Sequence, residues 1–237
     1  MSHLGNVVTK GWRWVLTALT QTVHVKKPKG KKGATNNSNN TRCRIPIVDT
    51  IFWDAQVGAA VEWIWANKHG QIVRKKPVHL SASSIIARFE GILRDNNGAA
   101  DSVIAYAFAG SSRVDLTFAQ LQALVSATDE ENHNDEDVDI DFGIGVIDSI
   151  QLAIQSKVSN FVVLRNVYSV VSGDKHVTTK TVAVDSQGAV SPFESPHICH
   201  QIDLFTQRIV KHVEQVTKFD MLRLEVDYVI DASDRIW

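Results

Sequence analysis

Apolar residues recur at helical spacing along the first two-thirds of the chain. In residues 7–25 they stand at every third or fourth position, and this spacing places them on one face of a helix. The members of this stripe are Val8, Trp12, Val15, Leu19 and Val23. The same spacing predicts four further helices, which begin at Asp49 or Thr50, at residues 81–84, at Asp115 and at Ile147. The short apolar run of residues 103–109 fits a buried strand or a helical turn equally well.

The last third of the chain has a different pattern. Residues 160–171 and 176–185 are rich in Val and Thr, and the turn-forming residues 172–175 between them predict a β-hairpin. Ser195 followed by Pro196 indicates the start of a long helix. From residue 222 to residue 230 apolar and charged residues largely alternate, as in a strand with one buried face.

These elements predict an α+β protein in three parts. Residues 1–44 are expected to form a flexible basic N-terminal arm with one short amphipathic helix, and residues 45–158 a helical bundle. Residues 159–237 are expected to form a C-terminal part with the order strand–strand–helix–strand.

Length and composition exclude several classes of protein. The chain has 237 residues, of which 44% are hydrophobic and 22% are charged, so it has enough apolar side chains for a buried core. Two cysteines cannot form a disulfide framework. No stretch has the roughly 18 uncharged apolar residues of a membrane-spanning helix, and the N-terminus does not have the pattern of a secretory signal. A secreted miniprotein, a transporter and a fibrous repeat are therefore excluded.

Charge is divided unevenly along the chain. Residues 1–50 contain nine Lys or Arg against one acidic residue and carry +8, whereas the remaining 187 residues carry −9. Seven of these cations lie within residues 26–44, where there is no acid: Lys26, Lys27, Lys29, Lys31, Lys32, Arg42 and Arg44. We expect them to neutralise the phosphates of a nucleic acid without reading its sequence. A solvated linker, a solubility tail, a nuclear-import signal and a membrane contact are the alternatives.

Three other clusters of residues could bind a metal ion or a partner, but their patterns are less specific. Residues 129–141 hold eight carboxylates, which would suit a cation or the magnesium of a nuclease, but their spacing does not match a calcium loop. His197, Cys199 and His200 lack a fourth ligand for zinc. We therefore expect no bound metal, no cofactor and no enzymatic activity. On the predicted helix at residues 49–70, Trp63 and Trp65 would lie about 200° apart, so one of them is expected to contact a neighbour.

The middle region resembles the coat proteins of rod-shaped plant RNA viruses, of the tobamovirus and hordeivirus type. The resemblance lies in three stretches, IFWDAQVGAAVEWIWANKHG, HLSASSIIARFEGILRD and SSRVDLTFAQLQALVSATDEENHND. It implies a four-helix bundle that stacks into a rod around single-stranded RNA. It also implies that Asp115 caps the third helix of the bundle and that Trp53 anchors its core.

The sequence therefore predicts a viral coat or nucleocapsid subunit. It would assemble into a large homo-oligomer, bind single-stranded RNA through the basic arm, and occur in the virion and the host cytoplasm. The first alternative is a peripheral membrane or matrix protein, in which the helix with Trp12 and Trp14 and the lysine cluster contact anionic lipid. The second alternative is a metal-dependent nuclease that uses Asp137 and Asp139.

Overall fold

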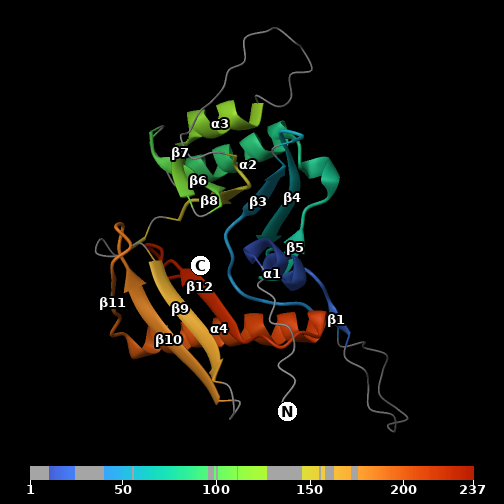
Figure 1. Cartoon of the computed structure of the whole chain (residues 1–237). Coiled ribbons are helices and arrows are strands. Elements are labelled where there is room, and N and C mark those ends of the chain that lie inside the picture. Colours follow the sequence, from blue (N-terminus) through green and yellow to red (C-terminus); the bar gives the residue numbers. More distant parts are fainter. Residues whose placement is uncertain are drawn as a thin grey trace.

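In the residues that it describes, the computed structural model contains four α-helices and two main antiparallel sheets (Figure 1). It describes residues 11–24, 40–54, 56–95, 99, 101–110, 112–126, 146–154, 156–157, 163–171 and 176–237. Strands make up 37% of the described residues, and these residues show no helical bundle in the middle region. The predicted fold class is therefore wrong in its central part, and so is the four-helix bundle implied by the resemblance to rod-shaped coat proteins.

The first sheet has six strands in the order β5-β4-β3-β8-β6-β7. Its strands and the helices between them are β3 (Thr50–Asp54), β4 (Ala59–Ala66), β5 (Ile72–Arg74), the 3₁₀ helix η1 (Pro77–His79), α2 (Ala82–Asp95), β6 (Val103–Ala109), β7 (Ser112–Thr117), α3 (Phe118–Ser126) and β8 (Ser149–Leu152). Helices α2 and α3 pack on one face of this sheet, where Ile51, Trp63, Phe89 and Leu121 are buried in one hydrophobic cluster.

The other face of the six-stranded sheet is partly covered by α1 (Trp12–Leu19) and by residues 43–47. Leu16 and Leu19 of α1 belong to the same buried cluster as Phe52 and Ile64 on this face. Helix α1 also packs on the C-terminal part of the chain, so it lies between the six-stranded sheet and α4 (Figure 1). Side chains from all three predicted parts of the chain thus share one core.

The second sheet has four strands in the order β11-β10-β9-β12, and one helix packs on it. Its elements are β9 (Val163–Val171), β10 (His176–Val184), β11 (Val190–Pro192), α4 (Pro196–Thr217) and β12 (Arg223–Tyr228). Strand β12 alternates strictly between exposed and buried residues, since only its face toward α4 is covered. Two polar contacts join α4 to this sheet, one from Thr206 to the hydroxyl of Tyr228 at 2.9 Å and one from Asn166 Nδ2 to Asp203 at 2.8 Å.

The predicted helix over residues 49–70 is instead a hairpin of β3 and β4. Neighbouring residues on opposite faces are buried together, as Ile51 and Phe52 are on β3 and Trp63 and Ile64 on β4, so apolar residues do not alternate with polar ones and their spacing also fits a helix. On a strand, residues two apart share a face. Trp63 and Trp65 therefore both lie against the core beneath α2, together with Trp53, and their placement gives no reason for one of them to meet a neighbour.

Two further predictions for the middle region are corrected. The helix predicted from Ile147 is the strand β8, and residues 103–109 form the strand β6. Asp115 lies inside β7 and does not cap α3. Thr117 takes that role, because its Oγ1 accepts a hydrogen bond from the Gln120 backbone N–H while its own N–H donates to Gln120 Oε1, which forms a capping box.

The predictions of four other helices, of the hairpin and of the last strand are confirmed. Helices α1, α2, α3 and α4 lie within the predicted segments, and Pro196 is the first residue of α4. Strands β9 and β10 form the predicted hairpin, and β12 is the predicted strand with one buried face. The short strand β11 follows the hairpin and is not among the predicted elements.

Candidate polyanion-binding segment and central cleft

The lysine-rich segment starts and ends at two paired strands. Strand β1 (Val23–His24) pairs antiparallel with β2 (Asn40–Thr41), with His24 opposite Asn40. Residues 25–39 connect these strands, so the segment begins and returns at neighbouring points of the fold. The sites predicted at Lys26, Lys27, Lys29, Lys31 and Lys32 lie outside the described residues.

Both ends of this segment are attached to the core. Before it, α1 is buried against α4, and His212 Nε2 donates a hydrogen bond to the carbonyl oxygen of Gln21 at 3.1 Å. After it, Cys43 and Ile45 are buried, and the backbone N–H of Ile72 donates to the carbonyl oxygen of Cys43 at 3.2 Å. Burial raises the pKa of the Cys43 thiol to about 12, so this cysteine is a protonated core residue and not a nucleophile.

The two arginines predicted as binding residues after the lysines are exposed. Arg42 follows β2 directly, and Arg44 forms a β-bridge with Gln71 beside β5. Neither has an ion pair with another described residue. These two side chains therefore extend the cationic segment onto the folded surface next to β2.

The apolar side of α1 is buried in the core of the protein. Val15, Leu16, Ala18 and Leu19 are buried, and Trp14 packs against the same cluster. A lipid contact through the apolar stripe of this helix would require α1 to leave α4 and the six-stranded sheet. The membrane alternative with α1 as the anchor is thus at odds with the packing of this helix.

A cleft of about 880 Å³ separates the uncovered half of the six-stranded sheet from the four-stranded sheet. Seven aromatic residues of the described chain line it, namely Trp12, Phe52, Trp53, Tyr106, Phe108, Tyr228 and Trp237. Two arginines lie over its rings: the guanidinium of Arg13 is 5.0 Å from the centre of the Phe52 ring, and that of Arg113 is 4.4 Å from the centre of the Tyr106 ring. This size is typical of ligand pockets.

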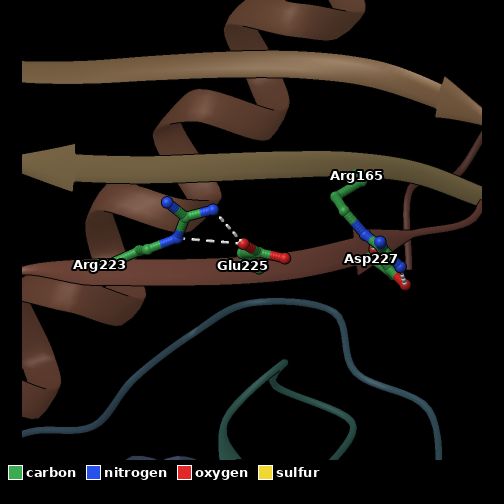
Figure 2. Close-up of polar contacts among 4 residues, drawn as sticks. All are labelled: Arg165, Arg223, Glu225 and Asp227. Carbon is green, nitrogen blue, oxygen red and sulfur yellow. Dashed lines mark hydrogen bonds and ion pairs between the residues drawn. The ribbon is translucent and has the colours of Figure 1, made fainter. Parts of the chain in front are cut away.

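Strand β12 forms one wall of the cleft and is an edge strand of its sheet. Val170 N–H donates to the carbonyl oxygen of Leu222. In an antiparallel pair every second residue forms the backbone hydrogen bonds, so Leu222 and every second residue after it bond through their backbone to β9. The backbone N–H and C=O groups of Arg223, Glu225 and Asp227 therefore point away from β9, toward the unpaired edge of the sheet. Their side chains are charged and paired, Arg223 with Glu225 and Asp227 with Arg165, as Figure 2 shows. Charged residues of this kind discourage pairing with another strand.

The charges of the cleft balance. Among the described residues, three arginines line it, at positions 13, 113 and 165, and three carboxylates oppose them, at positions 148, 225 and 227. Asp148 is already engaged, because its Oδ2 accepts the Gly110 backbone N–H at 2.8 Å. A neutral cleft does not attract a polyanion, so the cationic segment and not the cleft is the candidate nucleic-acid interface. Sequence reasoning missed the cleft because its lining comes from eight separate stretches of the chain.

The other clusters noted in the sequence do not form sites in the described part of the chain. His197 and His200 are exposed on the first turns of α4, and Cys199 is half-buried beside them. Within the described ranges, no group of three or more His, Cys, Asp or Glu side chains is placed to hold a metal ion. The acidic residues 129–141, including Asp137 and Asp139, lie outside the described residues. No described helix has the length and hydropathy needed to cross a membrane.

Comparison with known proteins gives no family. The chain matches no protein-family model and no curated protein. The class that the structure itself defines is a mixed protein with a six-stranded and a four-stranded antiparallel sheet that share a core through α1.

Proposed function

We propose that this protein is a structural nucleic-acid-packaging protein, a coat or nucleocapsid subunit of an RNA virus. It self-associates into a large homo-oligomer and binds single-stranded RNA through the cationic segment of residues 26–44. It acts in the virion and the host cytoplasm and is not an enzyme. The observation that carries this proposal is the placement of seven cations and no acid in a segment that the fold anchors at both ends.

The chemistry of this segment suits phosphates. Each cation that neutralises a phosphate releases a condensed counterion, which gives affinity without sequence preference. A packaging protein needs such binding, because phosphate contacts position a protein without specifying a sequence. The net −9 of residues 51–237 keeps RNA away from the rest of the surface, and it also allows the cationic segment of one copy to approach the body of the next.

The test is a change of lysines that leaves the fold intact. Deleting residues 1–44 would remove α1 and its buried Leu16 and Leu19, so substitution is the cleaner experiment. A variant with Lys26, Lys27, Lys29, Lys31 and Lys32 all changed to Gln should bind single-stranded RNA far more weakly. The slope of log affinity against log salt should also become shallower, by about 0.7 for each phosphate that the variant no longer neutralises. Filter binding across a salt series measures both quantities.

A matched control removes the same charge elsewhere. Five exposed lysines serve for it, each changed to Gln: Lys68, Lys76, Lys180, Lys211 and Lys218. This control should keep the RNA affinity and the salt slope of the natural chain to within about twofold. Equal losses in both variants would show that only net charge matters, and unchanged binding in both would refute the role of the segment. Sedimentation with and without RNA tests the assembly.

A further inference from the structure

The edge of β12 carries backbone groups that no described residue pairs with. Figure 2 shows β12 with the other strands of its sheet on one side only. The N–H and C=O groups of Glu225 and Asp227 point away from β9, and within the described chain they form no backbone hydrogen bond. The next position along the same edge is paired, since Val229 N–H donates to the Trp237 carbonyl oxygen at 3.1 Å and Trp237 N–H donates back at 2.8 Å. A strand pairing thus begins at Val229, and the edge continues beyond it with further groups of the same kind.

The central cleft runs along this edge. Residues 225–229 all line the cleft, although successive residues of β12 place their side chains on opposite faces of the sheet. A space beside one face of a strand would contact every second residue, whereas a space along its edge contacts all of them. The cleft therefore gives access to the unpaired backbone groups of Glu225 and Asp227.

The opposite wall of the cleft is rich in aromatic side chains. The strand register places Phe52, Ser149 and Phe108 side by side in one row across β3, β8 and β6. The residue after Ser149, Ile150, is buried on the other face of the six-stranded sheet, with the residues beneath α2. The row therefore faces the cleft, and its two rings offer a surface on which apolar side chains can pack.

This wall limits what can reach the edge. The sheet of a second folded copy would have to lie beside β12, where the six-stranded sheet stands across the cleft. One extended segment needs only the width of a single strand, about 4.8 Å. The charged side chains along β12 also discourage pairing with another sheet, and the balanced charges of the cleft favour a segment without net charge. The edge is thus suited to a single uncharged peptide strand.

We propose that the central cleft binds an extended peptide segment of a partner protein, which adds to β12 as a further strand. The segment has apolar side chains and no net charge. Its backbone pairs with the N–H and C=O groups of Glu225 and Asp227, beside the pairing that Trp237 makes with Val229. These main-chain bonds supply affinity, and the side chains that pack on the aromatic wall supply specificity. This binding does not depend on RNA or on the cationic segment.

The experiment measures the binding of synthetic peptides to the full chain by fluorescence polarisation. The probes are six-residue peptides, acetylated and amidated to remove their terminal charges, in which Thr alternates with Val, with Leu or with Phe. At least one of them should bind. Its affinity should fall about tenfold when the alternate residues that face β12 are N-methylated, because each loses a donor to a β12 carbonyl. The other alternate set points away from β12, so its N-methylation should weaken binding less.

A proline substitution tests the same bonds from the side of the protein. Asp227→Pro removes one N–H at the unpaired edge and no bond to β9, and edge strands accept proline at such positions. It should weaken peptide binding about tenfold. The matched control is Val190→Pro on β11, at the opposite edge of the same sheet. Ala189 bonds to β10 through Asp185, so the N–H of Val190 points away from β10, and Pro192 already occupies an equivalent position. This control should keep the affinity to within about twofold.

Four outcomes would overturn the proposal. One is the failure of every probe peptide to bind the natural chain. Another is an equal loss of affinity when either alternate set is N-methylated, which would mean that no strand forms. A third is a loss for Asp227→Ala, which keeps the N–H, as large as that for Asp227→Pro, which would assign binding to the carboxylate. The fourth is loss of self-association by Asp227→Pro with unchanged peptide binding, which would assign the edge to a second copy.

Two results keep this proposal separate from other effects. Circular dichroism shows whether Asp227→Pro is folded, and if it is not, the N-methylated peptides decide the question on the natural chain. Failure of RNA binding by the natural chain would refute the proposed function and leave the peptide site unaffected.

Discussion

The two sheets differ in the number of faces that the fold covers. In the six-stranded sheet, Trp63 on β4 faces the core beneath α2 while the next residue, Ile64, faces the core beside α1, and both are fully buried. In the four-stranded sheet, α4 covers one face only. Leu224 on β12 is buried beneath it, whereas the next residue, Glu225, is exposed. Neighbouring residues thus have the same role in one sheet and opposite roles in the other.

The number of covered faces determines how each sheet packs against the rest of the molecule. The second face of the six-stranded sheet is covered partly by α1 and partly borders the central cleft, so β3 and β4 have packed side chains on both faces. The outer face of β12 carries charged side chains that pair with one another in solvent. The first sheet is consequently a structural centre, whereas the second presents a charged face to the central cleft and has an unpaired edge.

The largest effects are expected from paired substitutions that test this contrast. Trp63→Ala and Ile64→Ala should each reduce the free energy of unfolding by about 3–5 kcal/mol, because each leaves a cavity in a filled core. On β12, Leu224→Ala should cost about 2–3 kcal/mol, whereas Glu225→Ala should stay within about 0.5 kcal/mol. Urea unfolding of the four variants at neutral pH measures these values. A cost for Glu225→Ala equal to that of Leu224→Ala would show that the outer face of β12 is covered as well.

The same contrast explains which elements can be predicted from the sequence. Strand β12 is predictable because one covered face leaves an alternating pattern along it. Strands β3 and β4 are mistaken for a helix because two covered faces remove that alternation. The spacing of Trp53, Val57 and Ile64 then fits a helical stripe by coincidence. Helices α2 and α4 each present one apolar side to a sheet, so their periodicity predicts them correctly.

The candidate sites follow a similar rule. The lysine-rich segment is local in sequence, so composition alone identifies it. The central cleft joins residues that are far apart in the chain, such as Arg13 with Phe52. Sequence separation hides such groups until strand order and register are known.

An intermediate effect is expected at the contact that holds α1 over the six-stranded sheet. Burial lowers the pKa of His212, although its hydrogen bonds to the carbonyls of Gln21 and Ala18 oppose this change. The folded protein therefore favours the neutral imidazole more than the unfolded chain does. The stabilisation is complete above the ordinary histidine pKa of about 6.5 and is lost as the pH falls below it. The contribution of His212 to the free energy of unfolding should therefore decrease as the pH falls from about 7.5 to about 5.5.

The variant His212→Gln isolates this contribution. Its amide retains a donor for the Gln21 carbonyl but does not titrate, so the decrease in stability toward acid should become smaller than in the natural chain. Urea unfolding at the two pH values gives the comparison. Identical acid sensitivity in both proteins would mean that other groups produce it, and that the docking of α1 does not respond to pH through His212.

The smallest effect is expected on the open face of β12. Arg165 donates two hydrogen bonds to the carboxylate of Asp227, at 2.7 and 2.8 Å, and these bonds raise the pKa of the guanidinium. The two side chains are 38% and 41% exposed, so water and salt screen the pair. A double-mutant cycle of Arg165→Met and Asp227→Asn should give a coupling energy of about 0.5 kcal/mol that declines as salt is added. A coupling energy of about 2 kcal/mol that resists salt would indicate a desolvated pair. In that case this face would be covered by another molecule in solution, and the contrast between the two sheets would hold only for the isolated chain.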